Sequence, residues 1–339
     1  MSPWDDLPLH NQATVLAAAE TPPDNWAERY YFNVLRPNGE IAAILGAGIY
    51  PRNGIAECYF CRIEDGTQHN ARACQPLAGA DRRSTPAPFS LRCVSAMHTW
   101  DALVNTEGAR FAGRYSALTQ PYHYSTVAIP ASVAGGPFDD WQHLVAAGRW
   151  DIETFSGNDG GNDFLCIRDR TWGLRTRRTR LHHWMVFEID GVCINILHQE
   201  RADGSILYSE GGIAWPDGRN ERLRIEAYGF DFDSNTREAR SGFFDLSGDG
   251  GDVRLEYVTI GVGIRLNGAG YDDSQGERAA GVQTDSYELG NPAVARDSGR
   301  GVIDIGGRAE VTGAWRGRGI GVVESAVARD HVRFGDQIA

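Results

Sequence analysis

The stretch H-H-W-M-V-F-E-I-D-G-V-C-I-N-I-L-H-Q, residues 182–199, carries two runs of β-branched and aromatic residues on either side of Asp190-Gly191. Residues of these types favour β-strands. An Asp-Gly pair tolerates the positive φ angles of a two-residue hairpin turn. The stretch therefore predicts two antiparallel strands joined by a tight turn.

The same pattern recurs along the chain. Further turn pairs between strand-like runs are Asn38-Gly39, Asn53-Gly54, Asp65-Gly66, Asp203-Gly204 and Asp217-Gly218. About 20 strands fit the chain, which favours two barrels or sandwiches in tandem. Helical patterns are few; short helices are expected at 11–20 and 139–150, with a helical turn near 98–105. The predicted fold is all-β, with two antiparallel β-domains.

A glycine-rich segment near the middle of the chain, F-S-G-N-D-G-G-N-D at 155–163, is the best candidate linker. It predicts a first β-domain over residues 25–160 and a second over 161–339. Residues 1–24 would form an N-terminal extension with a short helix.

Composition excludes several classes of chemistry. The chain of 339 residues contains no lysine, so it lacks the group needed for Schiff-base chemistry, a P-loop or a kinase β3 strand. A net charge of −12 disfavours a nucleic-acid-binding surface. No run approaches the roughly 18 apolar residues of a membrane span. We expect a cytoplasmic protein with no cofactor, no metal and no stable membrane insertion. A homodimer remains open.

Three stretches resemble a known bacterial family. W-A-E-R-Y-Y-F-N-V (26–34), I-R-D-R-T-W-G-L-R (167–175, with Thr171 where the family usually has Ser) and G-R-G-I-G-V-V-E-S-A (317–326) resemble motifs of the carotenoid 1,2-hydratase (hydroxyneurosporene synthase) family. Their order and spacing also fit. The resemblance implies two lipocalin-like, calycin-type domains with an apolar cavity in or between them. It does not specify the reaction.

Asp169 is the leading candidate for a catalytic acid or base. Protonating an alkene would require a desolvated carboxyl with a raised pKa. The alternative is a structural Asp that accepts backbone hydrogen bonds or pairs with Arg175. Trp172 could offer its π-face to a carbocation, or it could plug the end of a barrel. Arg175 could contact the ligand, pack on that indole or pair with a carboxylate.

Six arginines between 168 and 180 form either a solvated face or an anion site. His182 and His183 follow at once. Because neighbouring strand residues point to opposite faces, only one of the pair can face the interior. We place His183 as a proton shuttle and His182 as a substrate contact. Trp184 is included among the expected substrate-binding residues.

Other candidate residues lie outside this central stretch. Tyr31 and Asn33 share one face of a predicted strand, where Tyr31 could donate a hydrogen bond to a carbonyl or quench a cation. Tyr122 and Tyr124 belong to an aromatic cluster, and either pair could simply pack in a core. Glu324, beside two glycines, would need a partner if buried, for which Arg318 or Arg175 is expected.

Two classes of function follow. The first is a cofactor-independent hydratase, dehydratase or cyclase, a lyase or isomerase that acts on an apolar terpenoid, polyene or polyketide. Asp169, His183 and Tyr31 would be its catalytic groups. The second is a protein that binds a hydrophobic small molecule in the same cavity without changing it.

Overall fold

The computed structural model describes residues 3–6, 26–77, 85–129, 139–156, 160–174, 179–266, 277, 281–289 and 302–337. Over these residues the chain forms 20 strands and two short 3₁₀ turns, η1 (Pro3–Asp6) and η2 (Gly335–Gln337), with no α-helix. The predicted all-β fold with two antiparallel β-domains is confirmed. No helical segment of the described part is long and apolar enough to cross a membrane.

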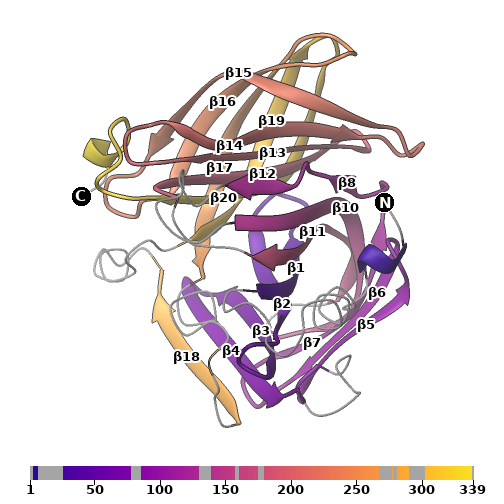
Figure 1. Cartoon of the computed structure of the whole chain (residues 1–339). Helices are drawn as coiled ribbons and strands as arrows, with labels where there is room; N and C mark the ends of the chain where they lie inside the picture. Colours follow the sequence, from indigo (N-terminus) through magenta and orange to yellow (C-terminus); the bar gives the residue numbers. More distant parts are fainter. Residues whose placement is uncertain are drawn as a thin grey trace.

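The C-terminal domain is a closed antiparallel barrel, in which the pairing of β20 with β12 joins the two ends of the sheet. Its strands are β12 (Leu181–Ile189), β13 (Val192–Glu200), β14 (Ile206–Ala214), β15 (Asn220–Phe232), β16 (Ala239–Ser247), β17 (Val253–Arg265), β19 (Ile303–Gly313) and β20 (Gly317–Val327). It occupies the upper half of Figure 1.

The N-terminal domain is a 12-stranded sheet with the order β18-β4-β3-β2-β1-β11-β10-β7-β6-β5, and β8 and β9 pair with β10. Its strands are β1 (Trp26–Leu35), β2 (Ile41–Tyr50), β3 (Ile55–Glu64), β4 (Thr67–Pro76), β5 (Phe89–Ser95), β6 (Thr99–Asn105), β7 (Arg110–Ala117), β8 (Tyr122–His123), β9 (Val127–Ile129), β10 (Asp139–Phe155), β11 (Gly161–Leu174) and β18 (Val282–Glu288). The expected boundary at residue 160 thus falls between β10 and β11, which pair in this sheet. Strand β18 returns to it from the second half of the chain.

The six Asn-Gly and Asp-Gly pairs named as predicted turns all join sequence-adjacent antiparallel strands. Each glycine has a positive φ, from 64° at Gly54 to 91° at Gly39. Asp65 and Asp190 are also left-handed, at 48° and 52°, as a type I′ turn requires.

The expected helices at 139–150 and near 98–105 were wrong, because these residues belong to β10 and β6. Strand β10 is buried on both faces: Trp141 and Val145 pack in one core, whereas Trp150 and Ile152 pack in another. A strand covered on both sides loses the alternation of apolar and polar residues that identifies it. The helix expected at 11–20 lies outside the described residues.

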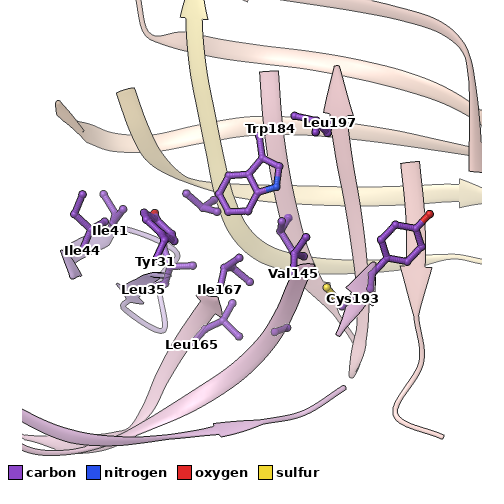
Figure 2. Packing of buried hydrophobic residues seen from close by; sticks show 14 of the residues in the cluster. Tyr31, Leu35, Ile41, Ile44, Val145, Leu165, Ile167, Trp184, Cys193 and Leu197 are labelled. Atoms are coloured by element: carbon purple, nitrogen blue, oxygen red, sulfur yellow. The ribbon is translucent and has the colours of Figure 1, made fainter. Parts of the chain in front are cut away.

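Side-chain alternation creates a core between the domains. Along β12, Leu181, Met185 and Phe187 fill the barrel, whereas Trp184 and Val186 point out of it toward the other domain. There they meet side chains of β1, β10 and β11, as Figure 2 shows for Trp184, Tyr31 and Ile167. We call this buried set the interdomain cluster; its residues are Tyr31, Leu35, Ile41, Ile44, Tyr59, Cys61, Tyr122, Tyr124, Val127, Trp141, Val145, Ala147, Leu165, Ile167, Trp184, Val186, Cys193, Leu197, Ala214, Ile264, Leu266 and Val322.

Candidate functional site

A carboxyl group lies at the edge of the interdomain cluster. Asp304 on β19 is fully buried, and its Oδ2 accepts a hydrogen bond of 2.7 Å from the Tyr31 hydroxyl. Its Oδ1 is buried with no hydrogen-bond partner among the described residues. Burial, and next the negative charge of Glu324, raise the pKa of Asp304 well above its usual range. Both effects favour the neutral acid, which keeps a proton available.

Glu324 lies directly opposite Asp304 in the register of β19 and β20. Its Oε1 is 2.6 Å from His182 Nε2, and the Gln199 side-chain amide lies 3.0 Å from His182 Nδ1. If the Gln199 nitrogen donates to Nδ1, the ring proton is on Nε2 and is donated to Glu324. Asp304, Glu324 and His182 therefore form a continuous polar chain. Arg318, an expected partner of Glu324, instead pairs with Glu310 at 3.0 Å.

Tyr31 and Asn33 lie on the same face of β1. The Asn33 amide is 3.4 Å from the Tyr31 hydroxyl, to which it donates, and its Oδ1 accepts a 2.8 Å hydrogen bond from the Ile167 backbone nitrogen. The Tyr31 ring meets the Trp184 indole edge to face at 5.8 Å. Burial, and next the Asp304 charge, raise the pKa of Tyr31 well above its usual range. Tyr31 thus stays protonated and donates to Asp304.

Asp169 points to the interdomain side of β11. Its Oδ1 lies 3.2 Å from His143 Nε2, and its side chain is 16% exposed. The neighbouring Arg168 and Arg170 point the opposite way, where they pair with Asp6 and Glu28. Alternation along the strand thus separates Asp169 from the arginines beside it in sequence.

Aromatic rings surround His143. Its imidazole stacks on Tyr124 at a centroid distance of 4.9 Å and lies 5.8 Å from the Trp184 indole. The Tyr124 hydroxyl and Trp184 Nε1 are buried and have no hydrogen-bond partner among the described residues. Buried polar groups normally have partners, so these atoms and Asp304 Oδ1 are suited to bind polar atoms of a ligand or water.

The structure separates the two histidines. His182 faces the interdomain cluster, whereas His183 lies inside the barrel, 2.8 Å from the Tyr257 hydroxyl and stacked on Phe230 at 4.2 Å. Burial lowers the pKa of His183 well below its usual range. His183 is therefore placed apart from the chain formed by Asp304, Glu324 and His182.

The remaining predicted site residues lie in different parts of the structure. Trp172 packs in the N-terminal domain, 5.1 Å from the Arg170 guanidinium. Tyr122 lies in the interdomain cluster, and its hydroxyl donates to Glu210 at 2.8 Å across the two domains. Arg175 lies outside the described residues.

Sequence reasoning missed Asp304 and His143. A signal for Asp304 was present, since V-I-D-I-G at 302–306 places one carboxylate within an apolar strand. The sequence gives no comparable signal for His143, because the pattern of its segment predicts a helix. Within the described residues, no three His, Cys, Asp or Glu side chains are arranged to hold a metal ion.

Comparison with solved structures finds a similar fold in one protein, at low sequence identity, and two weaker matches. The protein assigned as AttH of Nitrosomonas europaea matches with a TM-score of 0.52 and 10% identity, covering 93% of this chain and 98% of its own. Kievitone hydratase of Nectria haematococca matches with a TM-score of 0.49 and 12% identity, covering 91% of this chain and 90% of its own. The protein CghA matches with a TM-score of 0.49 and 9% identity, covering 90% of this chain and 89% of its own. At 10% identity, the likeness to the AttH protein concerns the fold alone.

No curated protein matches the chain in sequence. One family model does match, over residues 1–291, which is most of the chain. The protein therefore belongs to this family, which is described as a family of unknown function, DUF8625.

Proposed function

We propose that this protein is a cofactor-independent lyase or isomerase, of the hydratase, dehydratase or cyclase type, which acts on an apolar small molecule at the interdomain cluster. The observation that carries the proposal is the state of Asp304. Its carboxyl is fully buried beside an apolar core, and its burial and the neighbouring Glu324 carboxyl raise its pKa well above the usual range. Because its pKa is raised, this carboxyl keeps its proton at neutral pH and can serve as a general acid toward a ligand.

The proposed first step is a proton transfer. Asp304 gives its proton to a carbon–carbon double bond, whose π-electron pair forms the new C–H bond and leaves a carbocation. The new Asp304 carboxylate keeps the hydrogen bond from Tyr31 at 2.7 Å. The Trp184 indole packs edge to face against the Tyr31 ring, and an aromatic face of this kind stabilises a nearby cation.

The carbocation can then react in three ways. Addition of water and return of its proton to Asp304 completes a hydration. Loss of a proton from an adjacent carbon to the Asp304 carboxylate completes an isomerisation. Attack by a second double bond of the same molecule closes a ring and moves the positive charge to a new carbon, which then loses a proton to the Asp304 carboxylate. Glu324 and His182, in contact with each other at 2.6 Å, provide a route for the returning proton.

Asp304 replaces Asp169 as the proposed acid, and Asp169 becomes a second polar group of the site through its contact with His143 at 3.2 Å. A terpenoid, polyene or polyketide remains the proposed substrate class. Its support is the motif resemblance to the carotenoid hydratase family, together with the apolar residues of the interdomain cluster.

The test compares the wild-type protein with Asp304→Asn on a panel of terpenes, polyenes and polyketides. We expect Asp304→Asn to bind the same compounds and to lose about 100-fold or more in turnover. Asp245→Asn is the matched control, because this carboxylate is 40% exposed and pairs with Arg254 on the barrel. Turnover that survives in Asp304→Asn contradicts the proposal. If several compounds bind to the wild-type protein and none is transformed, the protein is a carrier.

A further inference from the structure

A second polar cluster lies inside the C-terminal barrel, at the end where the C-terminal segment sits (Figure 1). It shares no residue with the interdomain cluster. We call it the barrel-end cluster; its residues are His198, Glu200, Ser209, Tyr228, His331 and Arg333. Alternation along β13 and β14 aims His198 and Ser209 into the barrel, on the same faces as Ile196 and Ile213.

Three of these side chains form a hydrogen-bonded chain. His198 and Ser209 are direct neighbours across β13 and β14, and Ser209 Oγ lies 3.0 Å from His198 Nδ1. On the other side of the ring, His198 Nε2 lies 2.6 Å from Glu200 Oε1. A hydroxyl, an imidazole and a carboxylate in this order form the constellation that activates a serine nucleophile.

The charge states suit this role. Burial by itself would raise the pKa of Glu200, but the hydrogen bonds from His198, Tyr228 and Arg333 outweigh it and lower the pKa to about 2. Glu200 is therefore ionised at neutral pH and holds the proton on His198 Nε2. Burial lowers the pKa of His198, which keeps the ring neutral. Nδ1 is then free to accept the Ser209 proton.

Glu200 is held firmly in position. Tyr228 donates to its Oε1 at 2.5 Å, and His331 Nε2 lies 3.0 Å from its Oε2. Arg333 pairs with the same Oε2 and with the Tyr228 hydroxyl. His198, Glu200 and His331 are fully or almost fully buried, whereas Ser209 is half-buried and the Arg333 side chain is 42% exposed. The base and its carboxylate are thus shielded, whereas Ser209 is partly exposed.

We propose that Ser209, His198 and Glu200 form a second catalytic site, at which Ser209 is a nucleophile toward small carboxylic esters. Ser209 Oγ attacks the ester carbonyl while His198 Nδ1 takes its proton. The C–O bond to the alcohol then breaks, and His198 returns that proton to the leaving alkoxide. Water, deprotonated by His198, releases the carboxylic acid from the acyl-serine and restores the hydroxyl. Glu200 is a positioning residue that stabilises the transient imidazolium.

The test treats the full chain with a fluorophosphonate probe, whose phosphorus is attacked by an activated serine with loss of fluoride. We expect labelling of the wild-type protein, mapped to Ser209 by peptide mass spectrometry, and none of Ser209→Ala. Ser205→Ala is the matched control, because this serine is exposed and its hydroxyl donates to Asp203 in a turn. We expect it to be labelled like the wild type. His198→Asn should slow labelling by about 100-fold or more.

Two further arms keep the test decisive. Mapping the labelled peptide in the wild-type protein needs no variant to fold. Asp304→Asn should be labelled at the wild-type rate, because it alters only the interdomain site. No labelling of the wild-type protein, or a label on another residue, overturns the proposal and shows that Ser209 and His198 are structural partners only.

Discussion

The substitution Asp304→Asn also tests the electrostatics of the interdomain cluster through protein stability. An unfolded Asp ionises near pH 4, whereas burial and the charge of Glu324 raise the pKa of folded Asp304 well above that value. Below about pH 4 both states hold the proton, and the contribution of the neutral acid is fully present. As the pH rises, only the unfolded state loses the proton. Stability therefore falls until the folded carboxyl also ionises.

The magnitude follows from proton linkage. Each pH unit between the two pKa values costs about 1.4 kcal/mol of unfolding free energy. Asparagine has nearly the shape of the neutral acid and does not titrate, so Asp304→Asn lacks this loss. The stability difference between variant and wild type should then move in favour of the variant by up to about 1.4 kcal/mol per pH unit above pH 4.

The assay is urea denaturation at half-unit steps from pH 4 to pH 8, with Asp245→Asn as the control. The control should follow the wild-type curve, because Asp245 is 40% exposed and paired with Arg254. Parallel pH curves for Asp304→Asn and the wild type would refute the reasoning, since they would mean that Asp304 ionises in the folded protein as it does in water.

Two further sets of substitutions test a buried ion pair and the packing of the two domains. Glu28→Gln leaves Arg170 without its buried carboxylate, both side chains being fully buried, and should lower the unfolding free energy by about 3–5 kcal/mol in urea denaturation; a loss below about 1 kcal/mol would contradict this. Gly212→Ala places a Cβ 2.3 Å from the Tyr122 ring of the other domain and should cost about 1–3 kcal/mol. Its control is Gly108→Ala, where no atom lies within 4 Å. Equal melting temperatures for the two alanine variants would count against the close packing of the domains at Gly212.

Local chemistry made the strands predictable. Six Asn-Gly and Asp-Gly pairs mark six observed hairpins, because the backbone of a tight turn needs left-handed residues wherever it occurs. The alternation in β1 likewise places Tyr31 and Asn33 on one face before any tertiary contact is known. These signals depend on near neighbours in the chain.

The features that depend on long-range contacts could not be predicted from the sequence. Strand β10 was taken for a helix because two different cores cover its two faces. Asp304 acquires its environment from Tyr31, which is distant in sequence and belongs to the other domain. No local pattern reports such a neighbour. The sequence also does not show which of the two histidines faces the barrel interior. Alternation places His182 and His183 on opposite faces of the strand but does not say which face is the inner one.

The amino-acid sequence alone determined that this chain is an antiparallel β-protein, where six of its hairpins turn, and which residues share a strand face. These properties follow from the φ angles that each residue tolerates and from the two-residue period of a strand. The tertiary structure alone decided that Asp304, Glu324 and His182 meet beside a buried apolar core and that Arg168 and Arg170 turn away from Asp169. A carboxyl group becomes an acid of unusual strength or weakness only through its burial and its neighbours, and those are set by the packing of strands that are remote along the chain.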